Sequence, residues 1–423
     1  MTTESKPRAL VVGLGISGIS TAIQLQRNGW TPVIVERAPA RRSGGYFVGL
    51  FGAGKYSAER LGILDRLHNR TGAGVQTYQI DRQGRRRPGI GFADIPDAPW
   101  MMLRGDVEAA AFAELDPQTE IRYSTGPTAI IQDGDQVEVT LRSTATGEST
   151  TERFDLVVGA DGLRSTVRRL TFGPDAEHLH RLNYMIAAYE LPAELPGLAR
   201  GEGATLAEPG RSFWVFPFAD HASTVLWTWH TDDVDAEFTR TPAQRVREVF
   251  GTEPLGDTLE AAVQVLESAP EVLFDSVEQV RLERWHRGRV VLVGDSAWCV
   301  TLYAGMGVSS GIAGAELLGT ALARRPGDVE GALTEWEAQL RPYFEGFQEI
   351  GIKNRAFFVP ANRAESRRRR VMLRMRRSGL LARALQWLMR NNEAMRLRSA
   401  DVADPAAVVG GATAQPAVQR AAA

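Results

Sequence analysis

Cysteine, lysine and long apolar runs are scarce in this 423-residue chain. The one cysteine, Cys299, excludes a disulfide framework within the chain and fits a reducing compartment. No apolar run approaches the length that spans a bilayer, and the first residues lack the apolar core of a signal peptide. We therefore expect a cytoplasmic protein with no transmembrane segment, present as a monomer or a homodimer.

Metal-ligand clusters and hydrolase motifs are also missing. The six histidines are scattered and form no ligand set with Cys299, so we expect no bound metal. No nucleophile-elbow sequence occurs, which leaves a Ser-His-Asp hydrolase without support. The composition, 43% hydrophobic and 24% charged, is that of a globular protein, and the length suffices for two or three domains.

A glycine-rich turn near the N-terminus predicts a dinucleotide site. The apolar strand Ala9–Val12 leads directly into Gly13-x-Gly15-x-x-Gly18, and a helical pattern follows. Gly13 permits the tight turn, Gly15 lets a pyrophosphate approach the backbone, and Gly18 lets helix and strand pack closely. The diphosphate would lie at the helix N-terminus, where free N–H groups and the helix dipole favour anions.

The next strand supplies the acid that this kind of site needs. Residues 32–36 form an apolar run that ends in Glu36, 18 positions after Gly18. Glu36 is placed to accept hydrogen bonds from a ribose 2′-hydroxyl. Glycine motif, strand, helix and acid occur together, which favours a dinucleotide site over a chance glycine turn.

Two further motifs follow buried strands. The run 154–159 leads into Asp161-Gly162-x-x-Ser165-x-x-Arg168, and the run 290–293 leads into Gly294-Asp295-Ser296-Ala297. A second glycine-rich turn, Gly305-Met306-Gly307, then opens a long helix. Elsewhere the sequence predicts helices over 57–67 and 330–347 and short strands over 76–80 and 90–92.

Aromatic strands between these motifs predict an antiparallel sheet and a substrate cavity. Alternation places Trp214 and Phe216 on one face of the strand 211–218, while Trp227 and Trp229 share a face of the next strand. We expect these four side chains to line an apolar pocket. The alternative is that they form the ordinary core of the sheet.

Together the motifs resemble the single-component (class A) FAD-dependent aromatic hydroxylases of the para-hydroxybenzoate hydroxylase type, over about residues 8–350. The resemblance implies an α/β fold: a Rossmann-like FAD-binding domain of the glutathione-reductase type, an inserted antiparallel β-sheet substrate domain and a C-terminal helical segment. We expect these boundaries: FAD-binding domain 1–75, 100–175 and 271–348; substrate domain 76–99 and 176–270; Arg-rich helices 349–403; disordered tail 404–423.

The resemblance also implies a set of site residues. Those expected to bind FAD are Gly13, Gly15, Ser17, Gly18, Glu36, Arg37, Arg104, Asp161, Asp295, Gly305, Gly307 and Val308. Amides at 305–308 would stabilise the negative charge of the reduced flavin. Leu302, Gly305, Met306 and Gly307 would lie next to the ring. An Asp161–Arg168 ion pair and a surface position for Arg104 are the structural alternatives.

The implied activity is oxygenation by the flavin itself. NAD(P)H, a transient co-substrate, would reduce FAD; O2 would add at the flavin C4a, and the hydroperoxide would transfer one oxygen atom to an aromatic, multi-ring, polyketide-like substrate. Trp298 stands where the family usually has His, and Thr301 and Leu302 stand where it has a proline pair. These departures keep open an FAD-dependent reductase or dehydrogenase. A halogenase, whose motif is missing, and a flavin-free scaffold are weaker alternatives.

The C-terminal part is strongly basic. Residues 361–400 contain 12 Arg against Glu365 and Glu393. We expect a surface helix packed on the FAD-binding domain, with an apolar stripe turned inward: Leu381, Leu385, Trp387 and Leu388. Membrane-surface binding is the alternative. No nucleic-acid partner is expected, because no recognition motif accompanies the charge.

Overall fold

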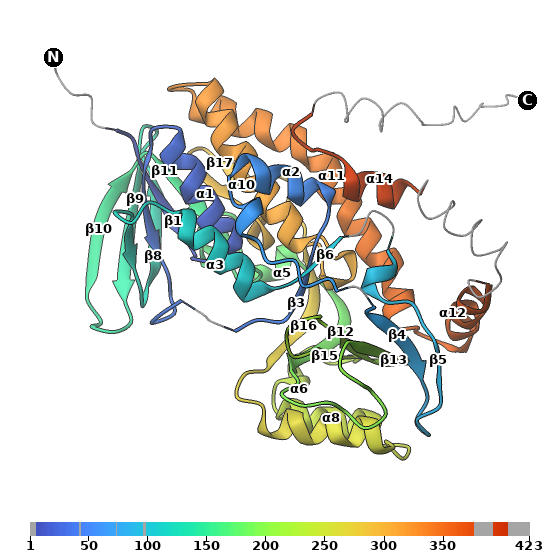
Figure 1. The fold of residues 1–423 in the computed structure, drawn as a ribbon. Helices are drawn as coiled ribbons and strands as arrows, with labels where there is room; N and C mark the ends of the chain where they lie inside the picture. The colour runs from blue at the N-terminus through green and yellow to red at the C-terminus, as the bar shows by residue number, and fades with distance from the viewer. Residues whose placement is uncertain (1–5, 42–43, 73, 96–98, 376–391, 405–423) are drawn as a thin grey trace, which may run out of the picture.

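A parallel sheet forms the centre of the larger half of the molecule (Figure 1). The computed structural model describes residues 6–41, 44–72, 74–95, 99–375 and 392–404. The sheet has the strand order β17 (His286–Arg287), β18 (Val290–Leu292), β11 (Leu156–Gly159), β1 (Arg8–Val12), β2 (Thr31–Val35) and β7 (Glu120–Arg122). All neighbours are parallel except β17 and β18. Its central strands are buried apolar runs, as a sheet covered on both faces requires.

Helices and a small antiparallel sheet complete this core. Helices α1 (Ile16–Arg27), α10 (Gly307–Arg324) and α11 (Val329–Phe358) share one hydrophobic cluster with the parallel strands. The three-stranded sheet β8 (Thr125–Gln132), β9 (Val137–Ser143) and β10 (Ser149–Phe154) contributes to the same cluster. The smaller helices α3 (Arg104–Glu114), α4 (Thr166–Thr171), α5 (Asp175–His178) and α9 (Asp295–Trp298) follow strands or loops of this half.

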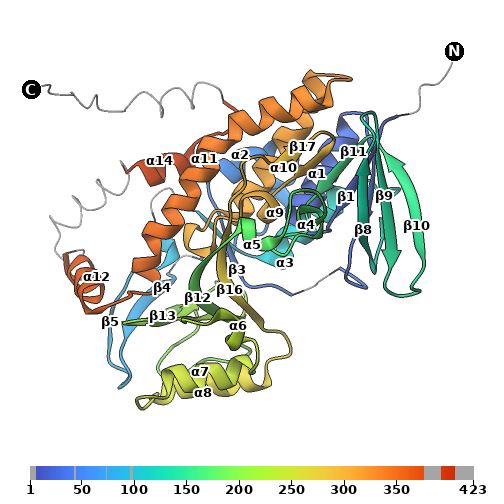
Figure 2. The ribbon, with the colours of Figure 1, turned by 180° about the vertical axis from the view of Figure 1, so that it is seen from behind.

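The second half is a seven-stranded sheet. Its order is β16 (Leu273–Val280), β12 (Leu179–Glu190), β15 (Thr224–His230), β14 (Arg211–Phe216), β13 (Glu202–Glu208), β4 (Gln76–Ile80) and β5 (Arg86–Pro88). Neighbours are antiparallel except for β13 and β4, which are parallel. Helices α6 (Val234–Glu237), α7 (Pro242–Phe250) and α8 (Asp257–Ser268) lie on the side away from the parallel sheet (Figure 2).

Short elements connect the two halves. β3 (Phe47–Leu50) pairs with β6 (Trp100–Leu103), and α2 (Gly52–Arg60) packs on α10. The single-turn elements are η1 (Leu64–Arg66), η2 (Phe92–Asp94) and η3 (Leu302–Ala304). At the C-terminal side, α12 (Arg363–Met375) lies near the β4–β5 edge, and α14 (Glu393–Ser399) packs on α11 (Figures 1 and 2).

Three local predictions were wrong. The helix expected over 57–67 is α2, which ends at Arg60 because Gly62 adopts a left-handed φ of +67°. The strand expected over 90–92 is absent, and the 3₁₀ turn η2 occupies 92–94. The helix expected over 330–347 continues to Phe358 despite Pro342. Burial of aromatic side chains on both sides of the proline offsets the lost hydrogen bond.

Some expectations concern residues outside the described part. The inward stripe of Leu381, Leu385, Trp387 and Leu388 falls within 376–391, and most of the tail 404–423 falls within 405–423; neither range is described. Within the described ranges, no helix is both long and apolar enough to cross a membrane.

Candidate cofactor and substrate site

The glycine turn between β1 and α1 is sterically obligatory. Gly13 has φ +108°, and a Cβ there would lie 2.5 Å from the carbonyl oxygen of Ala160. A Cβ on Gly18 would lie 2.0 Å from the carbonyl oxygen of Gly13. The first helical hydrogen bond of α1 runs from Ile19 N–H to Gly15 O (2.9 Å). The N–H groups of the preceding turn therefore face an anion-binding position.

Glu36 is held at the mouth of this turn. Its carboxylate accepts hydrogen bonds from Leu14 N–H (2.9 Å) and Ala38 N–H (2.8 Å), one on each oxygen. A carboxylate has about four acceptor positions, so capacity for ribose hydroxyls remains. Arg37 is exposed beside it.

Arg104 reaches the start of α1 from α3, which excludes the surface alternative. Its Nη2 lies 3.6 Å from the position of a Gly15 Cβ and 2.7 Å from Glu108 Oε1. Burial lowers the pKa of Arg104, but Tyr46, Glu108 and Asp295 outweigh burial and raise it. The guanidinium thus stays charged beside the predicted diphosphate position.

Asp295 shares this environment. Its side chain is accessible to solvent, although protein atoms surround it on most sides. That surrounding raises the pKa of its carboxyl, while Arg104 opposes the rise. Burial likewise raises the pKa of the Tyr46 hydroxyl. The charge of Arg104 lowers this pKa, and the charge of Asp295 raises it. Arg104 thus lies beside Gly15 and is near enough to Asp295 to affect the pKa of its carboxyl.

The turn Gly305-Met306-Gly307 begins α10. Gly305 N–H donates to Leu302 O (3.0 Å), so Gly305 is not one of the free amides expected over 305–308. Gly305 adopts φ +70°, Met306 caps the helix, and the first helical bond runs from Ser310 N–H to Met306 O (2.8 Å). Gly307 is exposed, and a Cβ there would meet nothing within 4 Å. The N-terminus of α10 thus points its donors into open space, where the helix dipole favours negative charge.

Ser17, in the first glycine turn, lies close to Gly294 and to Gly311 of α10. Its Oγ lies 2.3 Å from the position of a Gly294 Cβ and 2.6 Å from that of a Gly311 Cβ. A Cβ at either point would crowd Ser17, so the two glycines let the start of α1 lie close to α10. Val308, in the first turn of α10, is buried.

Asp161 has a clear local role. Its carboxylate accepts hydrogen bonds from Ser165 Oγ (2.5 Å), Thr166 N–H (2.6 Å) and Val167 N–H (3.2 Å), so it caps α4. The alternative pairing with Arg168 is wrong, because Arg168 pairs with Asp175 at 2.6 Å. Contact between Asp161 and a cofactor stays a prediction.

The departures from the family pattern have different environments. Trp298 is 1% exposed and packs on Trp285 and Phe344, with ring centroids 4.7 and 4.4 Å away, so it belongs to the core. Thr301 adopts φ +71°, an uncommon conformation for a β-branched residue. Leu302 is half-buried and packs in the cluster between the two halves, as Tyr303 does.

The two faces of the seven-stranded sheet divide the predicted substrate residues. Trp214 and Phe216 lie with Tyr184, Ile186 and Leu226 on the FAD-side face, which packs on Phe47, Tyr303 and Phe358. Trp227 pairs in register with Phe213, so Trp227 and Trp229 point the other way, onto the helix-covered face beneath α7 and α8. The prediction that all four share one pocket is wrong, because adjacent residues of β14 face opposite sides.

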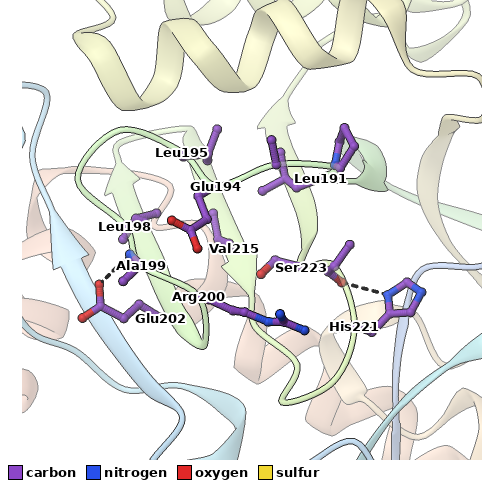
Figure 3. Close-up of a pocket in the computed structure, with 13 residues that line it drawn as sticks. Leu191, Glu194, Leu195, Leu198, Ala199, Arg200, Glu202, Val215, His221 and Ser223 are labelled. Carbon is purple, nitrogen blue, oxygen red and sulfur yellow. Dashed lines mark hydrogen bonds between the residues drawn. The ribbon is translucent and has the colours of Figure 1, made fainter.

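A separate cavity of about 320 Å³ opens on the helix-covered side (Figure 3). It is lined by Leu191, Glu194, Leu198, Val215 and His221, among others. Val215 belongs to the helix-covered cluster, whereas its neighbours Trp214 and Phe216 belong to the FAD-side one. This cavity is therefore on the far side of the sheet from the two glycine turns.

Sequence reasoning missed several residues of this region. Phe47 stacks on Phe216 with ring centroids 4.5 Å apart, and Phe358 O accepts a hydrogen bond from Trp214 Nε1 (3.2 Å). Arg369 of α12 lies over the Trp214 ring, and Arg398 of α14 bonds to Ala304. The C-terminal residues carry no local motif, so only the fold reveals them. Among the described residues, no group of three His, Cys, Asp or Glu could bind a metal ion.

Comparisons with known proteins give the family and the fold. Residues 6–328 match the family model described as "FAD binding domain". The chain is 28% identical over 376 residues to the monooxygenase CTB7 of Cercospora beticola, covering 83% of this chain and 87% of that protein. Among solved structures it resembles the tetracycline destructase Tet(51), with TM-score 0.72, 22% identity and coverage of 92% and 98%. It also resembles Klebsiella pneumoniae HpxO complexed with FAD and uric acid, with TM-score 0.65, 20% identity and coverage of 94% and 96%.

The fold and the paired glycine turns define a flavoprotein of the α/β class. The chain belongs to the FAD binding domain family, and it is an FAD-dependent monooxygenase of the class A, para-hydroxybenzoate hydroxylase type. FAD is its cofactor. The residues present fit that cofactor: two helix N-termini offer free amides, Gly307 leaves open space, and Arg104 supplies a cation at the start of α1.

Proposed function

We propose that the protein uses NAD(P)H and O2 to insert one oxygen atom into an aromatic, multi-ring small molecule. When bound, FAD supplies the redox chemistry and the activation of oxygen. The chain supplies binding, orientation and a dry environment. One structural neighbour is a tetracycline destructase, and tetracycline is a multi-ring compound, which supports this substrate class.

We infer how the cofactor would lie. The Gly13–Gly18 turn and Arg104 would bind the diphosphate, Glu36 the adenosine ribose, and Asp295 the ribityl part. The amides that begin α10 would face the pyrimidine end of the ring, where negative charge develops on reduction. The single observation that carries this placement is that Arg104 Nη2 lies 3.6 Å from the position of a Gly15 Cβ, at the N-terminus of α1.

The substrate would lie between that ring and the FAD-side face of the sheet. Trp214 and Phe216 contribute apolar side chains to this face, and Leu302 of η3 packs in the same cluster. Apolar walls exclude water from the reacting centre, which oxygen transfer requires. We accordingly propose that the segments 76–99 and 176–280 act as the substrate domain, and that residues 1–75, 100–175 and 281–348 act as the FAD-binding domain. The boundary expected at 270 lies later, because β16 is a strand of the seven-stranded sheet.

Labelled oxygen tests the proposal. Aromatic and polyketide compounds are screened for stimulated NAD(P)H oxidation by the FAD-loaded protein, and a compound that responds is converted under ¹⁸O₂. We expect one labelled atom in the product and no conversion without oxygen. Unlabelled product, or conversion that proceeds equally well under nitrogen, would replace the proposal with the reductase alternative.

The variant Asp295→Ala tests the proposed placement of the cofactor. Removing a charged partner of buried cofactor groups weakens FAD binding by about 1.5–3 kcal/mol, roughly ten- to a hundredfold. Flavin content after gel filtration and titration with added FAD measure the change. Unchanged affinity would remove Asp295 from the proposed site while leaving the oxygen experiment unaffected.

A further inference from the structure

Four arginine side chains are buried in the described part of the chain, and they fall into two kinds. Arg82 pairs with Glu208 at 2.7 Å, and Arg168 pairs with Asp175 at 2.6 Å. Arg369 and Arg398, both from the basic C-terminal part, have no carboxylate partner among the described residues. A buried charge without a counter-ion is costly, so such a residue calls for an explanation.

Arg398 lies directly behind the turn that begins α10. Its Nη2 donates to Ala304 O at 2.7 Å, and Ala304 is followed by Gly305-Met306-Gly307. Its guanidinium also lies 5.0 Å from the centroid of the Phe51 ring. That ring is 3.3 Å from the position of a Gly305 Cβ, and Phe51 N–H donates to Ser309 Oγ (3.1 Å). Arg398, Phe51 and the turn thus form one packed unit.

The segment that carries Arg398 is held by hydrogen bonds to neighbouring helices. Asp401 forms two hydrogen bonds with Arg60 (2.9 and 3.1 Å), and Arg60 also bonds to Glu316 of α10 (2.9 Å). Val402 O accepts a hydrogen bond from Gln339 of α11 (2.9 Å). The guanidinium is therefore held in place by α2, α10 and α11 rather than resting on the surface.

The charge of Arg398 persists despite its burial. Burial lowers the pKa of its guanidinium to about 10, which leaves it protonated at neutral pH. Arg398 Nε has no hydrogen-bond partner. A cation in this state interacts strongly with any negative charge that forms nearby, because little solvent screens it.

We propose that Arg398 is a positioning residue for the flavin, which holds the 304–307 turn against the pyrimidine end and favours the reduced, negatively charged state. This inference rests on the cofactor placement proposed above. Hydride transfer from NAD(P)H to FAD yields NAD(P)⁺ and a reduced flavin with one negative charge, so the positive charge of Arg398 stabilises the product of that step more than its reactant. The C-terminal part of the chain would thereby set the reduction potential of a cofactor that binds to the N-terminal part.

The test compares the midpoint potential of bound FAD in matched variants. Arg398→Gln keeps an N–H donor for Ala304 O and removes the charge. We expect its two-electron potential to become more negative by about 30 mV, a tenfold weaker preference for reduced flavin. Arg398→Lys retains the charge and should restore most of that shift. Arg396→Gln removes an exposed arginine of the same helix and should leave the potential unchanged.

The outcomes separate this inference from the proposed function. A potential equal to that of the unmodified protein in Arg398→Gln, or an equal shift in Arg396→Gln, would overturn the inference while FAD remains bound. If Arg398→Gln does not fold, Arg60→Met loosens α14 without removing Arg398, and the expected shift is smaller but in the same direction; no shift there would overturn the inference too. An unmodified protein that takes up no FAD would instead defeat the proposed placement.

Discussion

The two faces of the seven-stranded sheet are made of the same kinds of residue and have different neighbours. On the helix-covered face, Trp227 Nε1 donates to Tyr189 OH (3.2 Å) and Trp229 Nε1 donates to Glu237 Oε2 (3.1 Å). Every one of these contacts comes from residues 179–280. On the FAD-side face, the partners Phe47, Tyr303 and Phe358 come from distant parts of the chain. The origin of the neighbours, rather than aromatic content, distinguishes the two faces, and the face packed on distant parts of the chain is the one proposed to bind substrate.

Truncation on the helix-covered face should have the largest effect on stability. Trp227→Ala removes a fully buried indole and is expected to lower the free energy of unfolding by about 3–5 kcal/mol. Denaturant unfolding of the FAD-loaded protein measures the loss. The folded variant should keep its substrate KM, because Trp227 faces α7 and α8. A raised KM with normal stability would show that the helix-covered face also takes part in substrate binding.

Truncation on the FAD-side face should act on substrate binding. Trp214→Ala and Phe216→Ala are each expected to raise the substrate KM about tenfold, roughly 1.4 kcal/mol of binding. FAD content per folded protein should stay close to normal. Steady-state kinetics with the compound found in the screen measure the effect, and Phe213→Ala, from the same strand but the opposite face, is the matched control. Equal KM values in all three variants would remove the FAD-side face from the site.

The smallest effects are expected from two buried tyrosines, one on each face of the sheet. Tyr303 OH bonds to Thr228 Oγ1 (2.9 Å), and Tyr189 OH donates to Ala262 O (2.6 Å). Tyr303→Phe should cost about 1 kcal/mol of stability, the net contribution of one hydrogen bond. Tyr189→Phe should cost about 2 kcal/mol, because Tyr189 OH also accepts a hydrogen bond from Trp227 Nε1. Only Tyr303→Phe should alter the KM or the FAD affinity, since it joins the sheet to η3. Equal KM values and FAD affinities in the two variants would show that the contact between Tyr303 and the sheet does not affect the site.

The parts of the site governed by local rules were predictable. Gly13, Gly18 and Gly305 occupy positions whose φ or close contacts admit no side chain, so the sequence patterns at 13–18 and 305–307 indicate their geometry directly. The positions of β1, β11 and β18 followed from buried apolar runs of the length that parallel strands need.

Features set by register and by distant contacts were not predictable. Alternation assigns Trp214 and Trp227 each to a face of its own strand, but only the Phe213–Trp227 pairing shows that these are different faces of the sheet. Arg398 and Ala304 are 94 positions apart, and no motif links them. The core position of Trp298 likewise depends on two distant helices: Phe344 of α11 packs on its ring, and Gly314 of α10 leaves room for the ring, because a Cβ there would lie 2.6 Å from it.

The strand order of the parallel sheet has a consequence for how the chain folds. The adjacent strands β1, β11 and β18 begin at residues 8, 156 and 290, so the β1–β11 and β11–β18 pairings each close a long loop. Such non-local pairing is slow, whereas the hairpins β8–β9 and β9–β10 form from nearby residues. Until β18 is added, β11 offers an unpaired apolar edge, the kind of surface that recruits other chains. Premature termination before residue 290 should therefore yield aggregates rather than a smaller, working flavoprotein.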